Sequence, residues 1–219
     1  MRRAALILPA ILTAVLPAYS LQSSLPDSPA ARFAAAAPEV HEYRAWRRLE
    51  AESPRFGLAG WIEVVTTLGP TGFTYEVVGE GGSERIRRSV LRAALDAERE
   101  LVADAAAALT GDNYVFADDG AQDGLARIRV TPRRRSKALL DGYLLVTPRD
   151  SDLVELHGQL VKTPSFWVSR VDMVRRYARI LGVRLPVLTE SVARVRLAGR
   201  STFAMRYVYT SVDGRPVPR

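Results

Sequence analysis

The chain has 219 residues, which suffices for one domain with a sizeable core. Of these residues 47% are hydrophobic and 25% charged, a composition that excludes a disordered chain. Its formal net charge of +7 is mild for this length and far from the charge density of a nucleic-acid-binding protein. Cysteine is absent and histidine occurs only twice, so disulfides are excluded and neither a metal site nor a cofactor is expected.

The first twenty residues are predicted to be a secretory signal peptide. Arg2 and Arg3 form a positive n-region, an apolar stretch follows, and Ala18 to Ser20 has the small-x-small pattern of a cleavage site. The apolar stretch is too short to span a bilayer. We therefore expect an exported, periplasmic protein that is soluble after cleavage, and nucleic acid is not an expected partner.

Two segments precede the first expected strand. Residues 21–38 are rich in Pro, Ser and Ala, which predicts a flexible lead-in. Residues 39–52 are predicted to form a short helix, because Val40, Tyr43 and Leu49 fall on one side at helical spacing.

From residue 55 the hydrophobic period changes to two. Strand-like stretches on either side of GPTG at 69–72 predict a hairpin. Residues 84–109 are predicted to form a long amphipathic helix, since apolar residues recur there at three- and four-residue steps. Further alternating stretches, separated by turn residues, continue to the C-terminus and are typical of consecutive antiparallel strands.

The stretch PSFWVSRVDMVRRYARI at 164–180 has two interpretations, a basic recognition helix or a strand. Its neighbours favour the strand, with the arginines facing water. Together these elements predict an α+β, mainly β fold for one domain over 39–219. A single strongly curved antiparallel sheet is expected, covered by the long helix and by the short N-terminal helix.

Aromatic and apolar side chains of the expected sheet and helix are candidates for a ligand cavity. They either pack as a core or line a concave apolar cavity of the kind that suits acyl chains, and the residues alone leave both interpretations open. The candidates are Trp61, Phe73, Tyr75, Leu91, Leu95, Val102, Tyr143, Trp167, Phe203, Met205 and Tyr207.

Polar motifs indicate no catalytic residue. His41 and His157 lack a serine or carboxylate placed beside them by a motif. DDGAQDG at 118–124 lacks the ligand spacing of a calcium loop and predicts a hairpin turn. PRRRSK at 132–137 is either a solvated loop or a contact for anionic lipid head groups or an acidic partner, through Arg133, Arg134, Arg135 and Lys137.

The order of signal peptide, short helix, hairpin, long helix and run of strands resembles the periplasmic lipoprotein-carrier superfamily, which is LolA- and LolB-like. GQLVKTPSFWVSRVDMVRRYARILGVRLPV and the later GRSTFAMRYVYTSVDGRPV are similar to portions of LolA-like proteins. The resemblance implies a half-barrel of antiparallel strands with a helical lid and an apolar cavity between them. It also implies carriage or sensing of lipids and lipid-modified proteins.

We therefore expect a non-enzymatic binding protein that holds the acyl chains of a lipid or lipid-modified protein for trafficking across the periplasm. A membrane-associated protein partner and transient contact with a membrane surface are compatible with this role. Two alternatives are a periplasmic sensor on the same fold, similar to RseB, and a secreted hydrolase. The hydrolase would use Asp118, Asp119 and Asp123, or His157.

Overall fold

The structure is a computed structural model, and part of the chain is described in it. Residues 1–20, the expected signal peptide, lie outside the described part. So do residues 21–27 and 37–38 of the expected lead-in, and residue 39. The described residues are 28–36, 40–103, 107–163, 166, 168–196 and 199–218.

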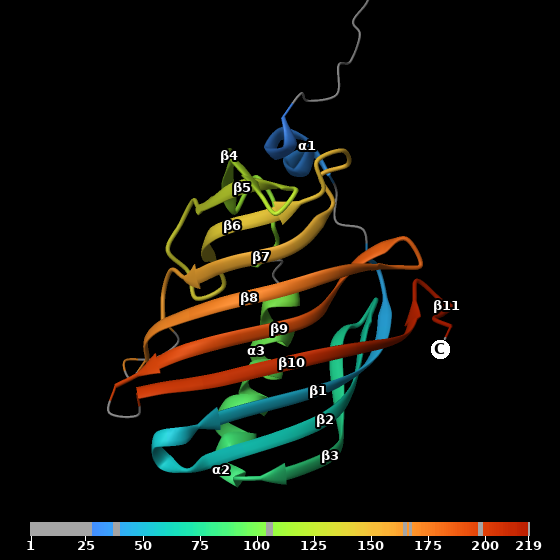
Figure 1. Cartoon of the computed structure of the whole chain (residues 1–219). Helices are drawn as coiled ribbons and strands as arrows, with labels where there is room; N and C mark the ends of the chain where they lie inside the picture. Colours follow the sequence, from blue (N-terminus) through green and yellow to red (C-terminus); the bar gives the residue numbers. More distant parts are fainter. Residues whose placement is uncertain are drawn as a thin grey trace, which may run out of the picture.

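One large antiparallel sheet dominates the fold (Figure 1). Its strands follow the order β3-β2-β1-β10-β9-β8-β7-β6-β5-β4, and the short β11 adds to β10. The mainly β, antiparallel fold predicted from the alternating pattern is thereby confirmed. The strands are β1 (Tyr43–Ser53), β2 (Leu58–Gly69), β3 (Gly72–Gly82), β4 (Tyr114–Gln122), β5 (Leu125–Pro132), β6 (Leu140–Val146), β7 (Leu153–Leu160), β8 (Val168–Ile180), β9 (Val183–Val195), β10 (Gly199–Val212) and β11 (Arg215–Pro216).

The two helical segments lie apart from each other along the chain. Helix α1 (Pro29–Ala35) precedes the sheet. The second segment connects β3 to β4 and runs through α2 (Glu84–Ile86), the π-helical turn η2 (Arg87–Arg92) and α3 (Ala93–Ala103). It confirms the helix predicted to begin at residue 84, but the predicted end at 109 is wrong, because residues 107–109 are not helical; residues 104–106 lie outside the described part. A short 3₁₀ turn, η1 (Pro54–Phe56), joins β1 to β2.

The helix predicted over residues 39–52 is wrong, because this segment forms strand β1. Its residues alternate between buried and more exposed positions, and Arg47 occupies a fully buried one at 1% exposure. A charged residue at a core position hides the two-residue period, while Tyr43, Trp46 and Leu49 happen to fall at helical spacing.

Helix α1 lies within the segment expected to be a flexible lead-in. The Ser28 side chain caps it by accepting a hydrogen bond from the Ala31 N–H, and Pro29 occupies the first helical turn. Its Phe33 is 3% exposed and meets Phe116 of β4 edge to face at 5.4 Å. Residues 29–35 are therefore part of the folded domain.

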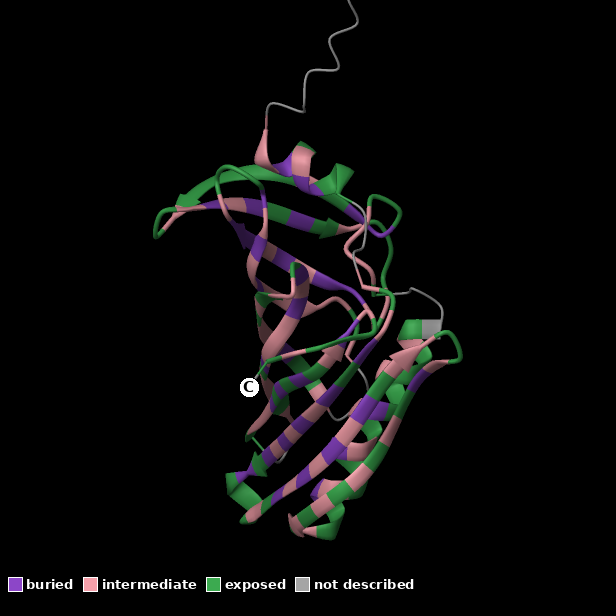
Figure 2. Cartoon of the chain, turned by 90° about the vertical axis from the view of Figure 1, so that its right-hand side faces the viewer, coloured by how far each residue is buried: buried purple, intermediate pink, exposed green. Residues whose placement is uncertain are grey.

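Buried apolar side chains form two separate clusters on the sheet. The first, under the long helical segment, joins Leu91 and Leu95 to residues of β1, β2, β3, β9 and β10. The second joins Phe33 of α1 to residues of β4, β5, β6 and β7. Figure 2 shows buried and exposed positions alternating along the strands. We call the sheet face that carries these clusters the inner face, and its opposite the outer face.

Most of the basic stretch at 164–180 forms strand β8. Residues 168–180 are a strand between β7 and β9, as predicted. Leu181 and Gly182, both with positive φ, form the tight turn into β9. Pro186 lies inside β9 and pairs with Tyr177, at the irregularity between the two strands.

A pair of glycines fixes the approach of β6 to β7. Gly142 lies opposite Gly158, and a Cβ added to Gly142 would stand 1.9 Å from the carbonyl oxygen of His157. Because no side chain fits at that distance, the register between these strands depends on glycine at position 142.

Candidate functional site

The inner face beneath the helical segment brings together several of the side chains predicted to line a cavity. Phe73, Leu91, Leu95, Met205 and Tyr207 are buried in the first cluster. Tyr75 and Phe203 are partly buried and pack against it. Seven of the eleven predicted residues therefore gather between the helical segment and the sheet.

The other four predicted residues do not join this group. Trp61 and Tyr143 lie on the outer face, where Arg48 covers the ring of Trp61 at 4.5 Å. Val102 is 38% exposed. Trp167 lies outside the described residues.

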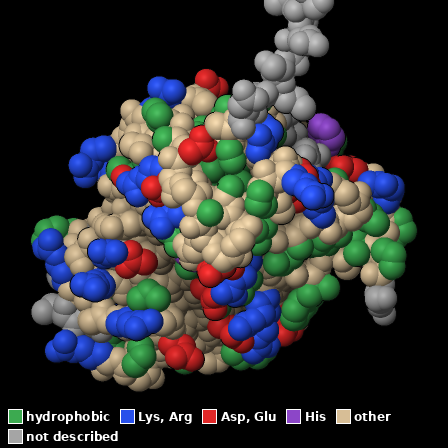
Figure 3. All heavy atoms as spheres, turned by 45° about the horizontal axis from the view of Figure 1, so that its top comes forward, with side chains coloured by type: hydrophobic (Ala, Val, Ile, Leu, Met, Phe, Trp, Pro, Cys, Tyr) green, Lys and Arg blue, Asp and Glu red, His purple; other side chains and the backbone are tan. Residues whose placement is uncertain are grey.

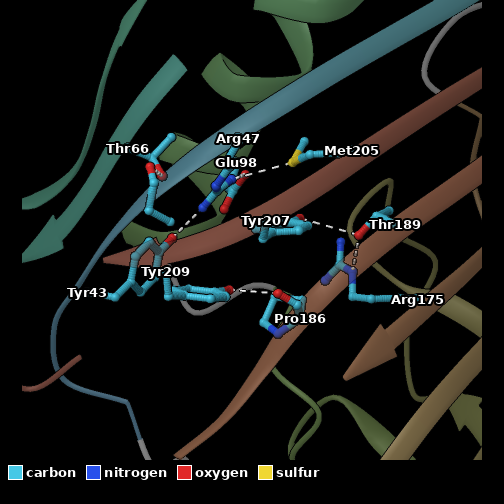
Figure 4. Close-up of polar contacts among 11 residues, drawn as sticks. Tyr43, Arg47, Thr66, Glu98, Arg175, Pro186, Thr189, Met205, Tyr207 and Tyr209 are labelled. Atoms are coloured by element: carbon cyan, nitrogen blue, oxygen red, sulfur yellow. Dashed lines mark hydrogen bonds and ion pairs between the residues drawn. The ribbon is translucent and has the colours of Figure 1, made fainter. Parts of the chain in front are cut away.

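An arginine on the inner face organises the site (Figure 4). Arg47 projects from β1 toward the helix, and its Nη1 donates to Glu98 Oε2 of α3 at 2.7 Å. Its Nη2 donates to the Tyr43 hydroxyl at 2.6 Å, and its guanidinium lies 4.6 Å from the ring centre of Tyr207. Its Nε has no hydrogen-bond partner among the residues that the structure describes. This cation is fully buried yet only partly satisfied by hydrogen bonds.

The environment of Arg47 perturbs several ionisable groups. Burial would lower the pKa of Arg47, but the charge of Glu98 with the nearby tyrosines outweighs it and holds that pKa above its usual value. Burial raises the pKa of Tyr43, although Arg47 opposes the effect. Burial likewise raises the pKa values of Tyr207 and Tyr209. Arg47 therefore stays charged and these tyrosines stay neutral at neutral pH.

A second arginine reaches the same site from β8. Arg175 lies opposite Thr189 of β9, and its Nε donates to the Thr189 hydroxyl at 3.1 Å. That hydroxyl lies 3.3 Å from the hydroxyl of Tyr207. The expectation that every arginine of this strand faces water is thus wrong for Arg175, because its place in the register puts it on the inner face.

Tyr207 therefore lies between two cations. Arg47 covers its ring, and Arg175 reaches its hydroxyl through Thr189. The neighbouring Tyr209 is fixed separately, since its hydroxyl donates to the carbonyl of Pro186 at 2.8 Å. The site combines two guanidinium groups, one carboxylate and several aromatic rings in a largely apolar interior.

The outer face carries an open groove of about 1110 Å³ that crosses β5 to β10 and reaches β1. In it the ring of Tyr143 stacks on His157 at 4.8 Å, with Arg127 covering Tyr143 at 4.2 Å. His157 Nε2 also lies 2.7 Å from Glu155. Most other charges of the groove are paired along the strands, such as Arg170 with Asp172 at 2.7 Å.

The aspartates suggested for a hydrolase have separate structural contacts. Asp118 accepts the Ala30 N–H of α1 at 2.9 Å, and Asp119 pairs with Arg127 at 2.9 Å. Asp123 occupies the turn between β4 and β5 with positive φ. Over the described residues, no group of three His, Asp or Glu side chains is arranged to hold a metal ion.

The basic loop joins β5 to β6 at one end of the sheet. Arg133 and Arg135 donate to the backbone carbonyls of Gly111, at 2.6 Å, and Val161, at 3.5 Å. Arg133, Arg134, Arg135 and Lys137 are all exposed. The antiparallel order places Lys162 and Arg196 in neighbouring loops at the same end. Figure 3 shows Lys and Arg side chains along the left side of the molecule.

No family model matches the chain, and no curated protein matches it significantly. No helix within the described residues is long and apolar enough to cross a membrane.

Three residues of the inner site escaped the sequence interpretation, namely Arg47, Glu98 and Arg175. Charged residues count against burial in any hydrophobic pattern, so a search for apolar faces does not select them. One signal was available: in both β1 and β8 a strict two-residue alternation includes an arginine among apolar residues on one face.

Proposed function

We propose that this protein is an exported, non-enzymatic binding protein that holds the acyl chains of a lipid or lipid-modified protein. The chains would lie between the helical segment 84–103 and the inner face of a half-barrel sheet, as in LolA-like proteins, for trafficking across the periplasm. The observation that carries the proposal is the interface of that helical segment, in which apolar side chains lie beside an ion pair whose arginine is buried.

The contacts between the helical segment and the sheet would allow the helix both to close over the sheet and to move away from it. Leu91 and Leu95 are fully buried, and each methylene of an acyl chain that replaced such contacts would contribute about 0.8 kcal/mol. The Arg47–Glu98 pair crosses from strand to helix and can be hydrated when the helix moves away. A helix held partly by a polar contact is therefore suited to act as a cover that opens for its ligand.

Ligand binding tests this proposal directly. We expect a fluorescent fatty acid to bind the mature protein saturably and to be displaced by unlabelled fatty acid. Hydrogen exchange with ligand bound should change along 84–103 and along inner-face residues of β1, β9 and β10, and little at the β4–β5 turn. Absence of saturable binding would remove the carrier proposal.

The basic end of the sheet suggests how the protein meets its partner. We propose that Arg133, Arg134, Arg135 and Lys137 contact an anionic surface, either lipid head groups or an acidic partner, because all four residues are exposed and the surrounding loops are also basic. Replacing the three arginines with alanine should abolish sedimentation with phosphatidylglycerol vesicles while fatty-acid binding persists. Loss of binding to a protein partner, with vesicle binding intact, would instead favour the sensor role.

A further inference from the structure

The interior site around Tyr207 contains unequal charge. The charged groups acting on this residue are Arg175, Arg47 and Glu98, which are two cations and one anion. Glu98 is already bonded to Arg47 at 2.7 Å. No carboxylate among the described residues lies within ion-pair distance of Arg175, whose Nε bond goes to a neutral hydroxyl.

The register of the sheet places Arg175 in a row of inner-face residues. Leu49, Met205, Thr189 and Arg175 form one row across β1, β10, β9 and β8, and Leu156 of β7 continues it. Arg175 is partly buried, whereas Arg176, the next residue, faces the other side and pairs with Glu155 at 2.9 Å. Arg175 and Arg176 are adjacent in one strand, and among the described residues Arg176 alone of the two has a carboxylate partner.

An uncompensated cation in a largely apolar interior is costly, and a ligand that supplies one negative charge would remove that cost. The remaining N–H groups of a guanidinium match the oxygens of a carboxylate or phosphate. The hydroxyls of Thr189 and Tyr207 are additional donors beside it. Met173 and Tyr177, two residues before and after Arg175 on β8, pack against the apolar residues of the second cluster.

We propose that Arg175, with Thr189 and Tyr207, forms an interior site for the anionic oxygen head group of an acyl-chain amphiphile, a carboxylate or a phosphate. The inference rests on the proposed function, since it assumes that an acyl chain enters beneath the helical segment, and it adds the charge of the ligand and the residues that recognise it. Arg47 remains paired with Glu98 and contributes its field.

The test compares ligands that share one chain and differ in the head group. Oleate, oleyl phosphate and the neutral methyl oleate would each displace a fluorescent fatty-acid probe from the full mature chain. We expect the wild-type protein to bind at least one of the two anions about ten- to a hundredfold more tightly than the ester, the range expected for a hydrogen bond to a charged group. Which anion binds more tightly identifies the head group.

Substitution of the two adjacent arginines supplies matched controls. Arg175→Met should lower affinity for the preferred anion about tenfold or more and leave affinity for methyl oleate unchanged. Arg176→Met should alter neither. If the Met variant does not fold, Arg175→Lys takes its place in the test. This variant keeps the charge and should retain most of the preference for the anion.

The outcomes separate this inference from the function on which it rests. If the wild-type protein binds none of the three ligands, the proposed function fails and the head-group site fails with it. If it binds ester and anions equally, or if a folded Arg175→Met variant keeps the preference for an anion, the head-group site alone is overturned and the carrier function stands.

Discussion

Arg47 of strand β1 and Glu98 of helix α3 join the sheet to its helix through a 2.7 Å ion pair, in which the arginine is 1% exposed and the glutamate 28% exposed. The pair is asymmetric. Without its partner, Glu98 would still be in contact with water, whereas Arg47 would not. Removing the negative charge is therefore more costly than removing the positive one.

This asymmetry predicts the outcome of a double-mutant cycle. Glu98→Gln should lower the free energy of unfolding by about 3 kcal/mol, because it leaves a buried cation uncompensated. Arg47→Met combined with Glu98→Gln should be more stable than Glu98→Gln alone, since no buried charge remains. Urea unfolding measures all the free energies, and strictly additive effects of the two substitutions would contradict the interpretation.

Buried tyrosines predict a loss of stability in alkali. The pKa values of Tyr43, Tyr207 and Tyr209 are raised by burial, so these groups stay protonated in the folded protein when unfolded tyrosines, with a pKa of about 10, ionise. The unfolded state then binds fewer protons than the folded state. Stability should be unaffected by these groups below about pH 10 and fall as the pH rises beyond it.

Tyrosinate absorbance, followed together with circular dichroism, checks this prediction. The absorbance of the buried tyrosines should appear only as the protein unfolds. Tyr209→Phe should reduce the steepness of the alkaline decline by up to about 1.4 kcal/mol per pH unit, and it also removes the hydrogen bond to Pro186. Ionisation of all the tyrosines before unfolding would show that these side chains are accessible.

Helix α1 should contribute measurably to stability through Phe33. This ring is 3% exposed and contacts Phe116, so Phe33→Ala is expected to lower the free energy of unfolding by about 3–5 kcal/mol. Phe56→Ala, at a phenylalanine that is 56% exposed, is the matched control and should change it by less than about 1 kcal/mol. Equal effects in urea unfolding would mean that α1 is not docked in solution.

Gly142 should tolerate no side chain. Gly142→Ala places a Cβ 1.9 Å from a backbone oxygen, so β6 and β7 must move apart and the melting temperature should fall by many degrees. Gly69→Ala, where a Cβ meets nothing within 4 Å, should leave the melting temperature nearly unchanged. A stable Gly142→Ala variant with unchanged hydrogen exchange in β6 would refute the close approach of the strands.

The parts of the fold that followed from the sequence are those with regular apolar spacing. The hairpin of β2 and β3 and the helix beginning at residue 84 were predicted from this spacing, whereas strand β8 was predicted from its neighbours in the sequence. Strand β1 was missed because Arg47 takes an inner position where an apolar residue is expected. A charged residue on the buried face therefore makes a strand harder to recognise from its sequence.

The candidate site was predictable in its apolar half and not in its polar half. Side chains such as Leu95 and Tyr207 were placed correctly beneath the helix, as their size and spacing required. The partnership of Arg47 with Glu98 and the inner position of Arg175 depend on which strands lie side by side. Those strands are far apart in the chain, and β1 with β10 is the extreme case.

The junction of β1 with β10 has a consequence for how the chain folds. Glu50 contacts Arg206 across this junction, 156 residues further along the chain, so the sheet is joined only after almost the whole domain has been synthesised. Such non-local pairing is slow, because a long loop must close before any contact rewards it. Until then β1 and β10 are both unpaired edges, and a nascent chain in this state is prone to aggregation.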